Sequence, residues 1–177
     1  MKTFYSTILL SFLISFVFAQ KEKKQEKIIA DSKEAKAAFL NQDSDMKEFF
    51  DSSHGYVIFP NVGKGGIGIG GASGNGTAYE NGKMIGMAKM TQVSIGFQLG
   101  GQAYREVVFF ETAEAMDRFK NNKIEFSAQV SAVAASSGAS ADAKFYEGVL
   151  VFTMQKGGLM YEASVGGQKF KFKEFDD

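Results

Sequence analysis

The stretch that decides the fold is GYVIFPNVGKGGIGIGG, residues 55–71. Its first part predicts a short apolar strand from Tyr56 to Pro60, because a proline is tolerated mainly at the edge or the end of a strand. Glycine then alternates with Ile67 and Ile69, so one face of the following strand carries almost no side chain. Such a face indicates a close backbone approach or strong bending. The stretch therefore predicts a glycine-rich, strongly bent sheet.

Signals for further strands continue on the C-terminal side. Fourteen of the 20 glycines lie between residues 55 and 101, and Asn75-Gly76 and Asn81-Gly82 are typical of hairpin turns. Apolar and small residues alternate over 93–100, which predicts a half-buried strand. Further strands are expected at 107–110, 124–132, 149–154, 159–165 and 168–173, with a loop of small residues at 134–143. The last three strands would form a closing antiparallel meander.

The last of these strands alternates Lys169, Lys171 and Lys173 with Phe170 and Phe172. Lysines on an edge strand prevent edge-to-edge aggregation, which is the simpler interpretation. The alternative interpretation is a basic stripe that faces anionic lipid.

Helical patterns frame the strands. Residues 20–54 predict two helices, about 24–41 and 45–52, and Asp45 with Glu48 resembles a capping box at the start of the second. The stretch from Glu111 to Asn121 predicts one internal helix with Thr112 as its N-cap. We therefore expect an α+β fold. It would be a bent antiparallel sheet or small β-barrel of eight or nine strands, with an N-terminal helical arm and one internal helix packed on it.

The first 19 residues have the pattern of a secretory signal. Lys2 is followed by an apolar run, and Val17 and Ala19 place small residues at positions −3 and −1 before Gln20. We expect cleavage after Ala19 and export to the periplasm or the extracellular space. The predicted organisation is a signal peptide at 1–19, a helical arm at 20–54 and a glycine-rich β domain at 55–177, with 20–177 as one unit.

Composition excludes several classes of function. The chain has 177 residues, no Cys, one His and a formal net charge of zero. A disulfide framework, a cysteine-based metal site and a thiol nucleophile are therefore excluded, and a nucleic-acid partner is not expected. No cluster of acids, bases and nucleophiles stands out, so we expect a protein that is not an enzyme and needs no metal or cofactor.

Three motifs that resemble functional sites are better explained otherwise. GIGIGG at 66–71 matches a dinucleotide fingerprint, but a hairpin follows it rather than the helix that such a site requires. His54 lies at a helix-to-strand junction, where a capping or packing role is expected. The acids Asp43, Asp45, Glu48 and Asp51 lack a glycine-centred calcium loop and are expected on a solvated helix face.

One basic feature remains a candidate site. Lys64, Gly65 and Gly66 are expected in a loop whose open amides, beside a lysine, suit a phosphate headgroup. The helical arm adds an amphipathic basic face, formed by Lys21, Lys23, Lys24, Lys27, Lys33 and Lys36.

The order of several motifs resembles the SYLF lipid-binding domain family. The motifs are GYVIFP at 55–60, KGGIGIGG at 64–71, SIGFQLGGQ at 94–102, EVVFF at 106–110 and KGGLM at 156–160. The likeness covers residues 30–173, and the chain differs from the family at 84–90, where a Trp-Ser-x-Pro motif is usual. Eukaryotic members bind phosphoinositides, and some bind actin filaments.

For an exported single-domain member, the resemblance implies affinity for anionic phospholipid. The Lys64 loop and the arm lysines would carry that affinity at a membrane surface. The alternative is an envelope or extracellular module that binds another protein, or has a structural role, and has no lipid ligand.

Overall fold

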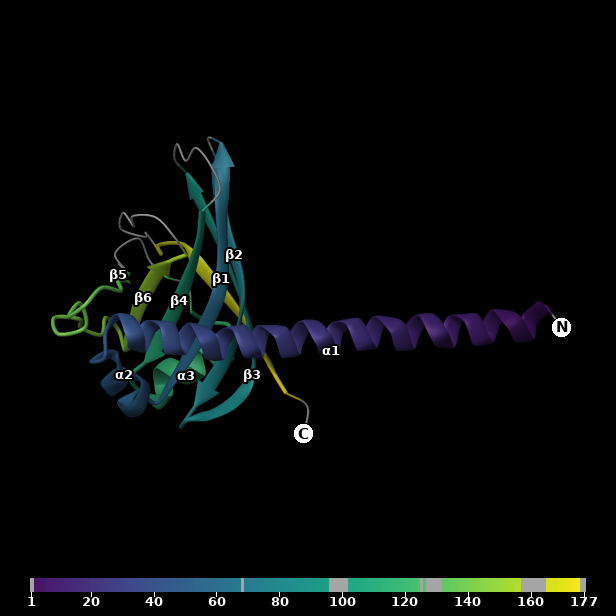
Figure 1. Ribbon diagram of the computed structural model, residues 1–177, viewed down its shortest axis with the longest axis horizontal. Coiled ribbons are helices and arrows are strands. Elements are labelled where there is room, and N and C mark those ends of the chain that lie inside the picture. Colours follow the sequence, from purple (N-terminus) through teal and green to yellow (C-terminus); the bar gives the residue numbers. More distant parts are fainter. Residues whose placement is uncertain are drawn as a thin grey trace.

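The computed structural model of the chain describes residues 2–67, 69–95, 102–124, 126, 132–156 and 165–175. These residues form three helices and one seven-stranded sheet, the α+β class that the sequence predicts (Figure 1). The helices are α1 (Lys2–Gln42), α2 (Met46–Ser52) and α3 (Ala113–Lys120). The strands are β1 (Gly55–Ile67), β2 (Ile69–Glu80), β3 (Lys83–Ile95), β4 (Gln102–Phe110), β5 (Val133–Ala134), β6 (Val149–Gln155) and β7 (Gln168–Glu174).

The sheet has the strand order β5-β6-β4-β1-β2-β3-β7. All pairs are antiparallel except β5 and β6, which are parallel. Consecutive hairpins link β1 to β2 and β2 to β3, whereas β4 returns to the other side of β1. The predicted strand residues 96–100, 125, 127–131 and 159–164 lie outside the described residues.

α1 is one long helix that lies across the sheet, and its N-terminal part projects well beyond the sheet (Figure 1). The two predicted arm helices correspond to the C-terminal half of α1 and to α2. The predicted capping box is wrong, because the Asp45 side chain makes no cap hydrogen bond. Asp43 instead accepts hydrogen bonds from the backbone N–H groups of Asp45, at 3.2 Å, and Ser140, at 2.9 Å. The α1–α2 turn is thereby tied to the loop of small residues.

β1 and β2 are longer than predicted. β1 runs through Pro60, because an irregularity between Ile58 and Asn61 accommodates a residue without an N–H. Gly76 is not in a turn but in the middle of β2, where a Cβ would lie 2.3 Å from the Ile58 carbonyl oxygen. The predicted turn at Asn81-Gly82 is confirmed, with φ of 49° and 75°.

The internal helix is confirmed as α3. The Thr112 side chain accepts a hydrogen bond from the Ala115 backbone N–H at 3.2 Å, which satisfies one of the free N–H groups of the first turn. Ala115, Met116 and Phe119 are buried, as the sequence predicts.

Buried side chains form a core on each face of the sheet. On the face covered by α1 and α2, here called the α1 face, Phe39, Met46 and Phe50 pack on the strands at Tyr56, Ile58, Val107, Phe109 and Phe152. On the opposite face, here called the α3 face, Met116 and Phe119 pack against Val57, Phe59, Phe110, Phe126 and Phe170. The sheet is therefore the middle of three layers.

The sheet curls around the α3 face. Glu106 of β4 contacts Gln168 of β7 at 2.9 Å, although β1, β2 and β3 lie between these strands in the sheet. The sheet is not closed into a barrel: among the described residues β5 and β7 are its two edges. Phe126 exchanges backbone hydrogen bonds with Gly167 and Gln168, so part of the β7 edge is covered.

Candidate binding surface

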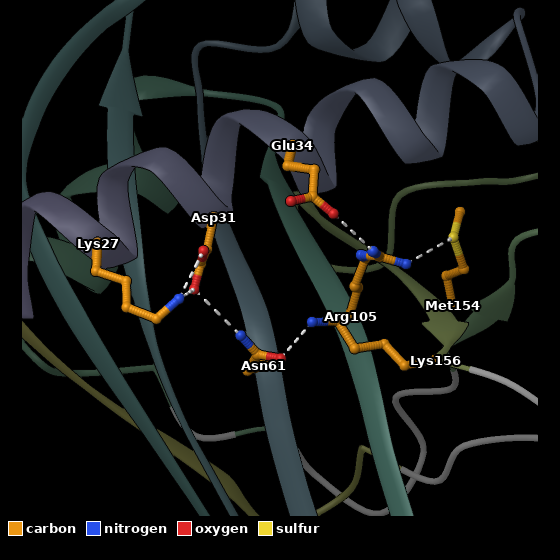
Figure 2. A network of polar contacts seen from close by, with 7 residues as sticks. All are labelled: Lys27, Asp31, Glu34, Asn61, Arg105, Met154 and Lys156. Carbon is orange, nitrogen blue, oxygen red and sulfur yellow. Dashed lines mark hydrogen bonds and ion pairs between the residues drawn. The ribbon is translucent and has the colours of Figure 1, made fainter.

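A polar network fixes α1 to the strands (Figure 2). On α1 the Lys27 ammonium lies 3.0 Å from the Asp31 carboxylate, which also accepts a 3.5 Å hydrogen bond from the Asn61 amide of β1. The Asn61 side-chain oxygen in turn accepts a hydrogen bond from Lys156, which follows β6. One chain of contacts therefore joins the helix to two strands.

Arg105 of β4 forms a second connection to the helix (Figure 2). Its guanidinium lies 3.3 Å from Glu34 and donates to the Met154 sulfur at 3.9 Å. Burial lowers the pKa of Lys156, and the positive charge of Arg105 lowers it further. This part of the α1 face therefore holds cations close enough to repel one another.

Lys36 has a packing role. Its ammonium lies 3.0 Å from the Tyr56 hydroxyl and within 5 Å of the centres of the Phe50 and Tyr56 rings, at 4.4 and 4.9 Å. Burial lowers the pKa of Lys36, while the Asp51 charge opposes that shift. This lysine stabilises the contact between α1 and the sheet and is the least available of the predicted arm lysines.

The other predicted arm lysines lie on α1, and Lys21, Lys23, Lys24, Lys27 and Lys33 are all exposed. Lys21 lines a groove of about 540 Å³ between α1 and the β3–β7 edge, and Lys173 lines the same groove. The arm therefore approaches the lysines of β7. Within the described part of the chain, no helix has the length and apolarity needed to cross a membrane.

Lys64, Gly65 and Gly66 lie in β1, not in an open loop. They pair with Ala72, Gly71 and Gly70 of β2, so the expectation of a loop with open amides is wrong. Lys64 is two residues beyond Val62, which is buried on the α3 face, and strand alternation places both on that face. The structure therefore separates Lys64 from the arm lysines by the thickness of the sheet.

The lysines of β7 occupy the edge strand, as predicted. Phe170 and Phe172 pack on the α3 face, so Lys169, Lys171 and Lys173 project on the α1 face, where all three are exposed. Lys89 of β3, which was not predicted as a site residue, pairs directly with Lys171. The missed signal was alternation, because Ala88 and Met90 on either side of Lys89 are buried.

Charge is divided between the two faces of the sheet. The described strand cations of the α1 face are Lys89, Arg105, Lys169, Lys171 and Lys173, and no described strand acid lies there. The described strand acids Glu80, Glu106 and Glu174 all lie on the α3 face, together with Lys64 and Lys83. On the α1 face, Arg105 pairs with Glu34 of α1 at 3.3 Å.

The other candidate motifs have structural roles. His54 lies 3.2 Å from Glu80, which also pairs with Lys120 of α3 at 2.9 Å, so His54 is part of a polar contact between the start of β1, β2 and α3. Asp43 is buried rather than solvated, and the hydrogen bonds it accepts outweigh its burial and lower its pKa. Among the described residues no three His, Asp or Glu side chains gather as metal ligands would.

A buried polar cluster on the α3 face was also missed. Glu106 and Gln168 are fully buried, and Gln168 Nε2 donates to Glu106 Oε2 at 2.9 Å. Burial raises the pKa of Glu106 to about 7, and the Gln168 hydrogen bond opposes this shift. Burial also raises the pKa of Tyr104, and the neighbouring Glu106 charge adds to that effect.

Comparison with known proteins yields two findings. Residues 91–174 match the family described as Ysc84, Las17-binding protein actin regulator. The chain is also similar to Beta cell expansion factor A of Aeromonas veronii, with 28% identity over 133 residues. That alignment covers 74% of this chain and 50% of the relative, so the chain spans about half of the relative's length.

Proposed function

We propose that this chain binds anionic phospholipid headgroups at a membrane surface. The match of residues 91–174 to the Ysc84 family, a SYLF-type family of binding domains, supports this proposal. The observation that carries this proposal is the division of charge across the sheet. Five strand cations lie on the α1 face, the described strand acids all lie on the opposite face, and the exposed arm lysines extend the α1 face. A surface of one sign attracts a surface of the other.

The pair formed by Lys89 and Lys171 supports a binding role. Like charges directly opposite each other on neighbouring strands are destabilising, so this arrangement costs folding stability. Each lysine close to an anionic bilayer contributes ~1 kcal/mol to binding. Contact with such a surface would offset the repulsion between the two ammonium groups.

The candidate site at Lys64, Gly65 and Gly66 is separate from the lysines of the α1 face. A flat membrane cannot contact both faces of the sheet in one orientation, so Lys64 and the arm lysines Lys21, Lys23, Lys24, Lys27, Lys33 and Lys36 need separate variants. We place the main contact on the α1 face. Lys64→Ala should then leave membrane affinity within about twofold of the unaltered chain.

We further propose that residues 1–19 are a signal peptide and that the protein acts in the periplasm or outside the cell. Supporting this, the side chains at 20–24 are exposed, and among the α1 residues whose side chains the structure describes, from residue 20 on, the first that is fully buried is Ser32. Mass spectrometry of the exported product should give a chain that starts at Gln20. Retention of Met1 in that product would contradict the proposal.

Co-sedimentation with vesicles tests the binding proposal. Residues 20–177 should bind phosphatidylglycerol vesicles, should not bind phosphatidylcholine vesicles, and should lose binding as salt rises. Lys89→Gln with Lys171→Gln should weaken binding by about one order of magnitude. The matched control, Lys64→Gln with Lys83→Gln, removes the same charge from the α3 face and should bind normally.

Two results would contradict the proposal. Equal losses in both double variants would mean that total charge, rather than the α1 face, sets binding. Absence of binding to any vesicle would favour the alternative, an envelope or extracellular module that binds protein or has a structural role.

A further inference from the structure

The Glu106 carboxylate has one oxygen without a partner. Its side chain has no solvent-exposed surface, and Gln168 Nε2 satisfies only Oε2. Oε1 has no hydrogen-bond partner among the described residues. Buried polar atoms are satisfied in the great majority of cases, so an isolated carboxylate oxygen here requires a physical explanation.

The neighbouring unsatisfied atoms are of the same kind. Gln168 Oε1 has no partner among the described residues, and the same holds for Gln155 Oε1 on β6. Thr153 pairs with Glu106 and Gln155 pairs with Tyr104, so Gln155 is the next same-face neighbour along β6. All three atoms are acceptors, so an occupant that satisfies them must donate hydrogen bonds or carry positive charge.

The protein supplies no cation to Glu106 within the part that the structure describes. None of its ion pairs involves this carboxylate. β1 contributes Phe59 and Val62, β6 contributes Thr153, and β7 contributes Gln168 and Phe170. On β1, the strand that pairs with β4, the described cation on this face is Lys64. It pairs with Gln102, which lies four residues from Glu106 along β4. The titratable neighbour is Tyr104, which is neutral at physiological pH.

We propose that Glu106, Gln168 and Gln155 form a binding site for one monovalent metal cation, sodium or potassium, held by their side-chain oxygens. Carboxylate and amide oxygens are hard ligands, which suit such ions better than soft metals. A single carboxylate balances a single positive charge, whereas a divalent ion would leave a buried charge uncompensated. The site lies on the α3 face and is independent of membrane binding.

The test is the thermal stability of the full chain at pH 8 in chlorides of sodium, potassium and tetramethylammonium at equal ionic strength. Sodium or potassium should raise Tm by about 4 °C over tetramethylammonium, which is too large for the site. Glu106→Gln should abolish this difference, and the exposed control Glu111→Gln should keep it. Protons compete for the same carboxylate, so the difference should also disappear at pH 5.5.

Equal Tm values in all three salts would overturn the proposal. Buried water would then be the donor to the unpaired oxygens. Stabilisation by calcium or magnesium alone would overturn the assignment to a monovalent ion. If Glu106→Gln does not fold, sodium-23 NMR of the unaltered chain decides. Line broadening that potassium reverses supports the site, and an unchanged line width contradicts it. None of these measurements uses lipid, so their failure leaves the membrane proposal intact.

Discussion

The two faces of the sheet differ in charge, although each has an apolar core. The α1 face combines rings from α1, α2 and the strands with exposed lysines on β3 and β7. The α3 face encloses the second core and holds the described strand acids, one of which is fully buried. Successive side chains of each strand point to opposite faces, so neighbouring residues in the sequence contribute to different faces. This difference in charge is the basis of our proposal that the α1 face, rather than the α3 face, contacts an anionic surface.

Removal of Phe39 should have the largest effect. Phe39 of α1 is fully buried against the strands, so Phe39→Ala should lower the free energy of unfolding by about 3–5 kcal/mol. Phe119→Ala on the α3 face should cost a similar amount. Urea unfolding measures both. An unchanged stability for Phe39→Ala would mean that α1 is an appendage rather than part of the fold.

The pH dependence of stability separates the two faces. The Glu106 pKa is raised from 4.5 to about 7, so the folded state holds a proton that the unfolded state has lost between these values. The contribution of Glu106 to stability should therefore be fully present below pH 4.5 and be lost as pH rises through 7, a change of roughly 3 kcal/mol. Urea unfolding from pH 4 to pH 8 in tetramethylammonium salts measures this slope. Glu106→Gln should flatten it, and a slope that persists in this variant would assign the effect to another group.

The pairing of β1 with β2 requires a glycine at one position. Gly76→Ala would place a methyl group 2.3 Å from the Ile58 oxygen and should destabilise the fold by about 1–3 kcal/mol. Gly63→Ala is the matched control, because no heavy atom lies within 4 Å of its added Cβ. Thermal unfolding of the two variants compares them directly. Equal effects would contradict the close approach of these strands.

The smallest stability effect is also the most specific for the α1 face. Lys89→Glu replaces a like-charge pair with an opposite-charge pair across from Lys171, so stability should rise by about 0.2–1 kcal/mol. Binding to anionic vesicles should fall in the same variant. A variant that gains stability and loses binding would show that the repulsion between Lys89 and Lys171 lowers folding stability while both lysines contribute to vesicle binding. If both quantities fall, that interpretation fails.

The sequence was sufficient for elements with strong local signals. Thr112 and the buried side of α3 followed helical spacing, and the turn at Asn81-Gly82 followed residue preference. The turn predicted at Asn75-Gly76 was wrong, because a glycine after Asn is as compatible with a close approach between strands as with a turn. The predicted end of β1 at Pro60 failed for a related reason, since a bulge at this point depends on pairing with two neighbouring strands.

The candidate site was less predictable than the fold. The lysines of β7 were visible from alternation, but their proximity to Lys89 depends on the pairing of β3 with the last strand. The separation of Lys64 from the arm depends on the irregularity that reverses alternation after Ile58. The Glu106 and Gln168 contact joins residues 62 positions apart across a curled sheet, and no local pattern indicates it.

The most direct test of the central claim is which face of the protein meets the membrane. The chain contains no cysteine, so single cysteines can be labelled specifically with a fluorophore that reports a nonpolar environment. Thr91→Cys places the label on the α1 face beside the lysines, and Ala113→Cys places it on the exposed start of α3. With phosphatidylglycerol vesicles, we predict a blue shift for the label at 91 and none at 113. A shift at 113 with none at 91 would contradict the account.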